Sequence, residues 1–383
     1  MSEVQCEEVA LTVQMLIESF PDEIVPFAGR LIAQLAAQFC QMTASSNDDE
    51  DAEGDAECAA MGSLATIVSV LQACSSLQNP EDAAEQQRRD ALFASMAQSL
   101  LPLVTKLLQP DGIDFIEEAL EMLAYLTAFC ATPIPAPIWA PFSRLYQAVC
   151  GKATASLPLP EVLKDGWATD SICSIRESML NYIARGPSGI FLAGTWAEGG
   201  MTYPDMLFDM VKKVLHQPGI GSEKDAAAGV DLAAALFEFV TPPVADHWLP
   251  RYFHELSIRL GTVETSDLRR AILVAFATMI WYNAQLFLRC AEEKGCTLQI
   301  FQVWMQKINT IREMREKKVM LLAKTRLLQL ACGQGLPQSV TQGLPHLIPI
   351  LAEQSKEIIR LRVKQASGTR DEEDSDSEDE ACT

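Results

Sequence analysis

Two runs of carboxylates are the residues of this sequence with the most specific chemistry. The first lies in TASSNDDEDAEGDAECAAMG, and the second is DEEDSDSEDE near the end of the chain. Clustered carboxylates attract lysine- and arginine-rich segments through long-range electrostatic steering. The candidate binding residues are Asp48, Asp49, Glu50, Asp51, Glu53, Asp55, Glu57, Asp371, Glu372, Glu373, Asp374, Asp376, Glu378, Asp379 and Glu380.

These two runs account for most of the charge of the protein. The formal net charge of the 383 residues is −21, and without the fifteen acids it would be −6. Binding to nucleic acid requires a clustered positive surface, so this balance disfavours nucleic acid as a direct partner. Basic proteins are the natural opposite partners.

Each run has two interpretations. We expect residues 44–58 to form a loop between helices, which either stays solvated or contacts a basic partner. Residues 366–383 contain too few apolar residues to fold, and we expect a disordered tail that is either solvated or competes for basic segments. Ser375 and Ser377 each precede an acid by three residues, which suits an acidophilic kinase and would make the tail more anionic.

No pattern predicts an enzyme. The histidines are His216, His247, His254 and His346, and the central two are seven residues apart, about 10 Å along a helix and too far to share a metal. The eleven cysteines form no CxxC pair, and their apolar surroundings favour reduced, buried thiols. We therefore expect no catalytic residue, no cofactor and no metal.

Two further segments leave alternatives open. Residues 309–328 contain six basic side chains, which form either a solvated helix face or a dock for the acidic tail. Residues 271–288 carry no charge and are long enough to be considered as a membrane span. The polar residues Thr278, Tyr282 and Asn283 favour a helix buried among other helices, so we expect no membrane insertion.

The elements that must position these residues are helices, because strand-like alternation is hard to find and 49% of the residues are hydrophobic. In 113–131, for example, apolar residues recur on one helical stripe. The expected helices span roughly 3–20, 22–42, 60–78, 88–108, 113–131, 137–150, 203–216, 223–240, 247–261, 265–290, 298–332 and 337–364.

Several of these helices open with a proline, which the first helical turn tolerates. A proline-started helix followed by a second apolar helix is typical of helix-pair repeats of about 40 residues. Residues 246–283 form the clearest pair, in which neither helix can bury its apolar face alone. The sequence thus predicts an all-α superhelical solenoid over 1–365, with an irregular, loop-rich region at 151–202.

The resemblance to a known family rests on DEIVPFAGRLIAQLAAQF, AMGSLATIVSVL, TSDLRRAILVAFATMIWYNAQLFL and the acidic C-terminus. Together these segments resemble the importin-beta superfamily, or karyopherins, and most of all the C-terminal part of the branch with importin-seven and importin-eight. Asp267 and Arg269 sit where HEAT repeats commonly hold an Asp and an Arg. The family pattern TSELR…YYNP is followed up to Ala284, where the proline is absent.

The resemblance implies an armadillo-like HEAT-repeat fold and a nuclear import receptor that moves between cytoplasm and nucleus through the nuclear envelope. Its partners would be basic cargo, such as histones or ribosomal proteins, and the Phe-Gly repeats of nucleoporins. The small GTPase Ran would bind N-terminal repeats that nothing in this sequence resembles, so we expect a part of a longer receptor. The alternative is a standalone HEAT-repeat scaffold or acidic chaperone without a transport cycle.

Phe-Gly repeats need shallow apolar pockets. FEFVTPPVADHWLPRYF, residues 237–253, is aromatic-rich and either offers such pockets or packs into the core.

Overall fold

The fold comes from a computed structural model, and helices dominate it. The structure describes residues 6–45, 53–76, 82–217, 222–307 and 313–333, together with 336, 338–341, 352, 355–356 and 359–360. Its contacts divide the chain into two compact units, Met1–Val240 and Thr241–Thr383. Within the described ranges no strand forms, and the only β-type pairing is an isolated bridge between Thr195 and Thr202. The all-α, HEAT-type fold class predicted from the sequence is confirmed.

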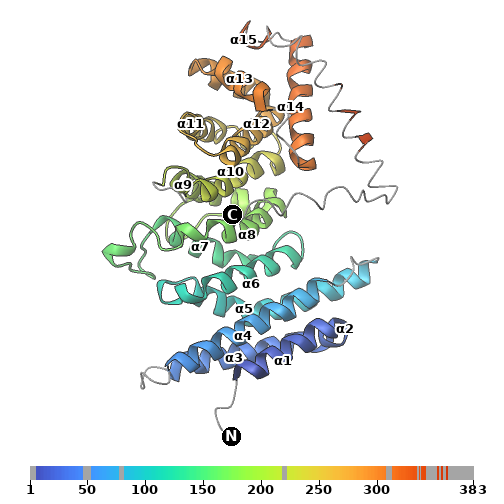
Figure 1. Ribbon diagram of the computed structural model, residues 1–383, viewed down its shortest axis with the longest axis vertical. Coiled ribbons are helices and arrows are strands. Elements are labelled where there is room, and N and C mark those ends of the chain that lie inside the picture. The colour runs from blue at the N-terminus through green and yellow to red at the C-terminus, as the bar shows by residue number, and fades with distance from the viewer. Residues whose placement is uncertain are drawn as a thin grey trace, which may run out of the picture. The chain divides into compact units, whose positions relative to one another are not determined.

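The first unit contains the longer series of helices, which Figure 1 shows stacked in chain order. Their bounds are α1 Cys6–Ser19, α2 Pro21–Ile24, α3 Ala28–Ser45, α4 Glu53–Ser75, α5 Ala83–Leu107, α6 Ile116–Phe129, α7 Ala140–Cys150, α8 Ile172–Ala184, α9 Tyr203–Leu215 and α10 Ser222–Phe239. Successive pairs pack as two layers, in which α3, α5, α7 and α9 contact one another in order, as do α4, α6, α8 and α10. This is the arrangement of HEAT-type helix pairs.

The second unit continues the same pattern with α11 Leu249–Leu260, α12 Ser266–Glu293, α13 Thr297–Lys307, α14 Met314–Gly333 and α15 Gln338–Thr341. Helix α12 packs on α11, α13 and α14. One apolar stripe of α12 is buried, because Leu268, Ile272 and Phe276 are buried, as are Met279 and Ile280.

Polar caps define where several helices begin. Asp82 precedes α5 and its side chain accepts a hydrogen bond from the backbone N–H of Glu85 at 2.8 Å. Thr202 and Thr265 act in the same way before α9 and α12. Each cap pairs one of the backbone donors that the first helical turn leaves without a partner.

An aromatic cluster forms the core where α7, α8 and α9 meet. The ring centroids of Trp139 and Tyr182 lie 4.8 Å apart, and those of Phe142 and Tyr203 lie at the same separation in an edge-to-face arrangement. The Tyr182 hydroxyl donates to the carbonyl of Ile138, so its polar end is paired inside the core. This cluster holds the loop-rich region after α7 against the helices.

Helix α12 is bent within its apolar middle. Asn283 has non-helical torsions, with φ −148° and ψ 84°, and its amide nitrogen donates to both carboxylate oxygens of Asp246 at 3.1 and 3.2 Å. Its side-chain oxygen accepts from the N–H of Leu286 at 3.1 Å, so it caps the second half of the helix. The bend lies next to Ala284, the position at which the family pattern carries proline.

The structure corrects two expected helices. The helix expected over 22–42 is interrupted around Pro26 by a short 3₁₀ turn before α3 begins. The helix expected over 298–332 is two helices, α13 and α14. In the region 151–202, expected to be irregular and loop-rich, α8 is the one α-helix longer than a turn among the described residues.

Candidate functional site

The acidic residues predicted to bind cargo lie mostly outside the described part of the chain. These are Asp48, Asp49, Glu50 and Asp51 of the first run, and the whole tail 366–383 with Ser375 and Ser377. Their roles stay predictions. The segment between helices is shorter than the predicted loop 44–58, because α3 extends to Ser45 and α4 begins at Glu53.

The helix pair α3 and α4 positions the first acidic run. The two helices pack against each other, so the run joins neighbouring ends of a helical hairpin. Glu53, Asp55 and Glu57 fall in the first turns of α4, where the helix dipole favours negative charge. These three positions therefore lie at one end of the helix pair.

The aromatic segment 237–253 is mainly core. Phe237, Trp248, Tyr252 and Phe253 are buried, whereas Phe239 is exposed. Core packing is thus the better of the two interpretations of this segment.

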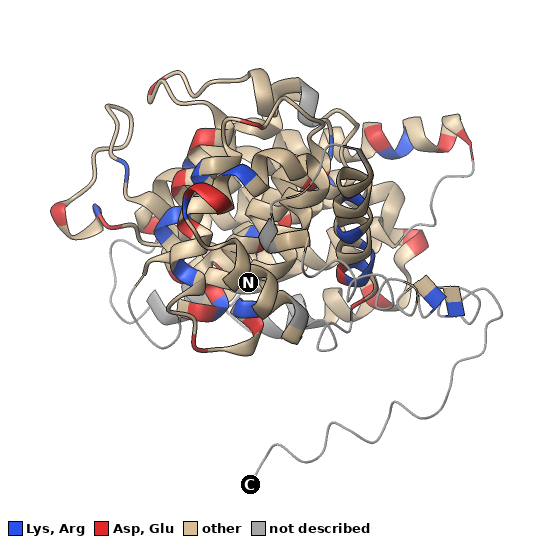
Figure 2. Cartoon of the chain, turned by 90° about the horizontal axis from the view of Figure 1, so that it is seen from above, with Lys and Arg blue, Asp and Glu red and all other residues tan. Residues whose placement is uncertain are grey.

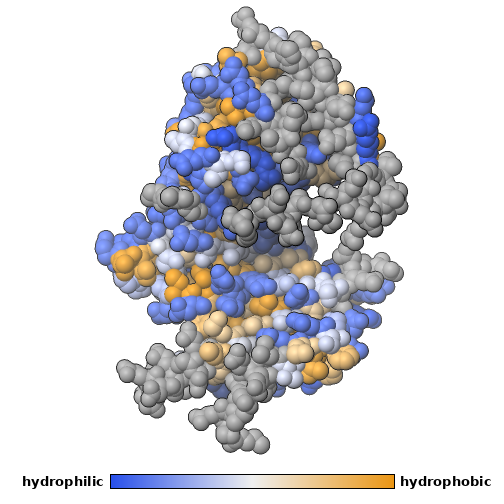
Figure 3. Space-filling model, viewed as in Figure 1, coloured by the Kyte–Doolittle hydropathy of each residue, from blue (hydrophilic) through white to orange (hydrophobic). Residues whose placement is uncertain are grey.

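An apolar groove lies instead between successive helices of one layer, α5 and the segment that leads into α7. Its volume is about 750 Å³, within the range of ligand pockets in proteins. Its apolar wall on α5 comes from Ala94, Ala97, Leu101 and Pro102, and the facing wall includes Cys130, Ala131, Pro135, Pro137, Ile138 and Ala140. The face drawn in Figure 3 likewise shows apolar residues between hydrophilic ones along the first unit.

Small side chains make the groove possible. Alanines at 94, 97 and 140 leave room that larger residues would fill. On the opposite wall, Pro135 is extended and the 3₁₀ turn Ala136–Trp139 follows it. Pro102 lies inside α5 and cannot donate to the carbonyl of Gln98, one turn earlier, on the same wall. The sequence did not predict this site. The alanines at helical spacing in α5 and the proline-rich segment after α6 are the features that point to it.

Arg185 holds the chain segment that follows α6 and forms one wall of the groove. Its guanidinium donates to the carbonyl of Thr127 at 2.7 Å, to the carbonyl of Cys130 at 2.5 Å and to the Thr132 hydroxyl at 2.7 Å. These acceptors lie at the C-terminal end of α6, where carbonyls lack helical partners and the dipole favours a cation. Arg185 therefore holds the turn that carries Cys130 into the groove.

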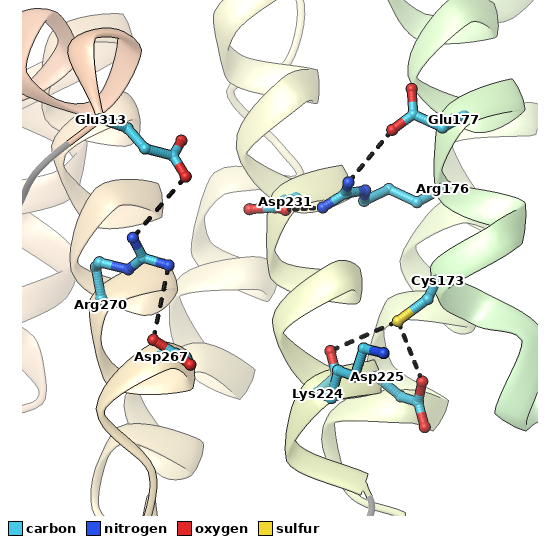
Figure 4. A network of polar contacts seen from close by, with 9 residues as sticks. All are labelled: Cys173, Arg176, Glu177, Lys224, Asp225, Asp231, Asp267, Arg270 and Glu313. Carbon is cyan, nitrogen blue, oxygen red and sulfur yellow. Dashed lines mark hydrogen bonds and ion pairs between the residues drawn. The ribbon is translucent and has the colours of Figure 1, made fainter. Parts of the chain in front are cut away.

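Polar contacts also tie neighbouring helices together, as Figure 4 shows. In the first unit, Arg176 of α8 pairs with Asp231 of α10 at 2.9 Å, and the Cys173 thiol lies 3.4 Å from an Asp225 oxygen. Burial raises the pKa of Cys173, and its contact with Asp225 raises it further, so the thiol stays protonated at neutral pH. These groups link neighbouring helices of the first unit.

In the second unit Arg270 of α12 reaches three carboxylates. It lies 3.7 Å from Asp267, 4.0 Å from Glu313 and 3.6 Å from Glu316. Arg269 instead donates to the carbonyl of Val263 at 2.8 Å. At the expected HEAT positions, Asp267 thus pairs with Arg270 and Arg269 bonds the turn before α12, whereas the contact with α14 comes from Arg270.

The basic segment 309–328 is not a uniformly solvated face. Lys324 of α14 is fully buried, and burial lowers the pKa of its ammonium to about 7. Arg315 and Arg326 are exposed, while Arg312 lies outside the described residues. Figure 2 shows basic and acidic residues interspersed over the helices.

Two described helices are long and apolar enough to cross a membrane by length and composition, Cys58–Ser75 and Ser266–Glu293, or up to three if the bent pair Ala83–Leu107 and Pro110–Phe129 is one span. Of the apolar windows in the first two, 56% and 67% are buried inside the protein. Neighbouring helices therefore cover much of the apolar surface. Within the described ranges, no group of three or more His, Cys, Asp or Glu side chains could hold a metal ion.

Comparison with known proteins gives relatives along nearly the whole chain. The importin beta-like SAD2 homolog of Arabidopsis thaliana is 27% identical over 362 residues, which cover 92% of this chain and 31% of the relative. The probable importin-7 homolog of Dictyostelium discoideum is 23% identical over 336 residues, 86% of this chain and 28% of the relative. No family model matches.

The chain spans about a third or less of the length of these relatives. Its helix pairs follow the order of HEAT-type repeats within each unit, and both relatives carry importin names. The relatives along 86–92% of the chain and the HEAT-type helix pairs thus support membership of the importin-beta superfamily.

Proposed function

We propose that this array is the part of a nuclear import receptor that contacts nuclear pore proteins and basic cargo. The carrying observation is the groove of about 750 Å³ between α5 and the start of α7. Its apolar walls suit a phenylalanine side chain, and polar groups at its edge, such as Gln98 and Gln109, suit the flanking peptide backbone. A Phe-Gly repeat of a nucleoporin supplies both.

This function is binding without catalysis. The activity of the longer relatives, including Ran-driven release of cargo and passage between cytoplasm and nucleus, comes to this chain only as a proposal. The acidic segments would add attraction for basic cargo such as histones or ribosomal proteins, because clustered carboxylates steer lysine-rich segments from a distance. A standalone scaffold or acidic chaperone would share the acids and would not bind Phe-Gly repeats.

The groove is tested by filling it. Ala94 is exposed and lines the groove, so Ala94→Arg should block the groove while leaving the core intact. Asp90, one turn earlier on the same helix, can form an ion pair with the new arginine. Ala91→Arg, on the same helix but outside the groove, is the matched control. We expect the affinity for a synthetic Phe-Gly repeat peptide, measured by fluorescence anisotropy, to fall about tenfold, or roughly 1.4 kcal/mol, only in Ala94→Arg.

Equal binding by the two variants would contradict the assignment to this groove. Absence of binding by the unmodified chain would contradict the receptor function of this part and favour the scaffold.

The cargo role is tested separately by replacing the seven acids of residues 48–57 with their amides. We expect weaker binding of a lysine-rich histone-tail peptide and a smaller dependence of affinity on salt, because exposed charges act through screened electrostatics. An unchanged affinity and salt slope would remove these acids from cargo binding.

A further inference from the structure

The apolar groove carries one negative and one positive side chain, far apart along its length. Among its lining residues only Asp90 and Lys106 are charged, and both lie on α5, sixteen residues apart. An α-helix rises about 1.5 Å per residue, so the two positions are separated by about 24 Å along the helix. The α5 residues that line the groove between them are uncharged. The groove therefore has a negative end and a positive end.

Asp90 forms the negative end and is not neutralised by a neighbouring cation. Its half-buried carboxylate accepts a hydrogen bond from the side-chain amide of Gln86 at 2.7 Å, and further lone pairs remain for a ligand. The next residue, Arg89, places its guanidinium over the ring of Phe129, 4.7 Å from the ring centroid. Within the described residues Asp90 forms no ion pair.

Lys106 forms the positive end. It lies in the last turn of α5, where the helix dipole favours a cation, and its side chain is exposed. No carboxylate in the described part of the chain pairs with it. Lys106 is therefore open to an anionic group of a ligand.

Two unpaired opposite charges at the ends of an apolar groove complement a ligand with the reverse arrangement. Glycine-containing segments form helices poorly, so a Phe-Gly segment lies in the groove as an extended chain. An extended chain advances about 3.3 Å per residue, and about seven residues therefore reach from Asp90 to Lys106. The phenylalanine then lies between them, against the apolar wall of Ala97 and Leu101.

We propose that the groove selects among Phe-Gly segments by charge. It prefers segments with a basic residue on one side of the phenylalanine and an acidic residue on the other, about seven residues apart. Asp90 pairs with the basic residue and Lys106 with the acidic one. This inference rests on the proposed function, because it names which Phe-Gly segments the same groove takes.

The test uses the full chain and labelled synthetic peptides that share one Phe-Gly core. One peptide is neutral, one carries a single lysine, one a single glutamate, and one carries both at the seven-residue spacing. Fluorescence anisotropy gives their affinities at low and at high salt. We expect each charge to strengthen binding about two- to fivefold over the neutral peptide, as exposed ion pairs do, and high salt to remove the gain.

Two substitutions assign each gain to its partner. Asp90→Asn should cancel the gain from lysine and keep the gain from glutamate, whereas Lys106→Met should do the reverse. Each peptide is thus the control for the other variant. Glu117→Gln and Arg88→Met remove charges at exposed positions outside the groove and should change neither gain, which separates local pairing from net charge.

The spacing of the charges gives an independent measurement. A peptide with lysine and glutamate only two residues apart spans about 7 Å and cannot reach both ends of the groove. We expect it to gain no more than the better of the singly charged peptides, whereas the seven-residue spacing should combine both gains.

The results distinguish this inference from the function on which it rests. If the neutral peptide binds and the gains are the same in Asp90→Asn, Lys106→Met and the two controls, charge selection is wrong and Phe-Gly binding stands. If no peptide binds the unmodified chain, both are wrong. Binding of only the doubly charged peptide, lost in both groove variants and kept in both controls, would support the inference.

Discussion

At the scale of single residues, two basic side chains are held most firmly by the surrounding helices, one by hydrogen bonds and one by burial. Arg185 donates to the end of α6, and Lys324 is fully buried in α14. Composition and periodicity cannot distinguish these two from the exposed cations around them. Their roles follow from packing between helices that are distant in the sequence.

Replacing Arg185 tests the support behind the apolar groove. Arg185→Met removes donors from three acceptors, and hydrogen bonds from charged groups contribute roughly 1.5–3 kcal/mol each in favourable cases. We expect a loss of about 2 kcal/mol in urea unfolding and weaker Phe-Gly peptide binding.

Arg326→Met is the matched control, because Arg326 donates to Gln329 within its own helix at 3.2 Å and both side chains are exposed. It should cost less than about 1 kcal/mol. Equal effects of the two substitutions would contradict the specific role of Arg185.

Lys324 makes the stability of the second unit depend on pH. Its pKa of about 7 in the folded chain lies below the ordinary value of 10.5, so the unfolded chain binds this proton more tightly. As pH falls from 10.5 toward 7, the free energy of unfolding should fall by up to roughly 1.4 kcal/mol per pH unit, and below 7 the penalty is constant.

Lys324→Met removes this penalty. Urea unfolding is measured at about pH 6.5 and about pH 9.5, which span most of this range. The gain in free energy of unfolding over the unmodified chain should be larger at the lower pH. Lys318→Met, on the same helix and half-buried, should show no such pH dependence. A gain that does not change with pH would contradict the burial argument.

At the scale of elements, apolar periodicity predicted most helices well, because each buries one stripe against its neighbours. Helices α6, α9 and α11 lie close to their expected bounds. The periodicity failed where polar contacts decide the path, as at Asn283, whose bond to Asp246 bends α12 within an apolar stretch. Periodicity also predicted α13 and α14 as one helix, because both carry apolar faces.

The bend predicts where α12 accepts proline. Ala284 follows the capping residue Asn283 and so occupies a first-turn position, which tolerates proline. We expect Ala284→Pro to lower the free energy of unfolding much less than Ala275→Pro does. Proline at position 275 would interrupt a continuous helical turn, which costs about 3 kcal/mol or more. Thermal unfolding compares the two, and equal losses would contradict the capping role of Asn283.

At the scale of the whole molecule, the sequence predicted the family and the helix-pair fold, and the relatives along most of the chain agree. It did not predict the apolar groove. The groove depends on alanines of α5 lying opposite prolines that follow α6. This is a long-range arrangement, whereas the acidic runs are visible in the sequence because they are local.

The proposed function requires that the groove between α5 and the segment leading into α7 brings this chain to nuclear pores. The most direct measurement is the accumulation of the fluorescently labelled chain at the nuclear envelope of permeabilised cells. We expect a saturable nuclear rim for the unmodified chain and for Ala91→Arg, and loss of the rim for Ala94→Arg. A chain that stays diffuse, or a rim of equal strength in all three, would contradict it.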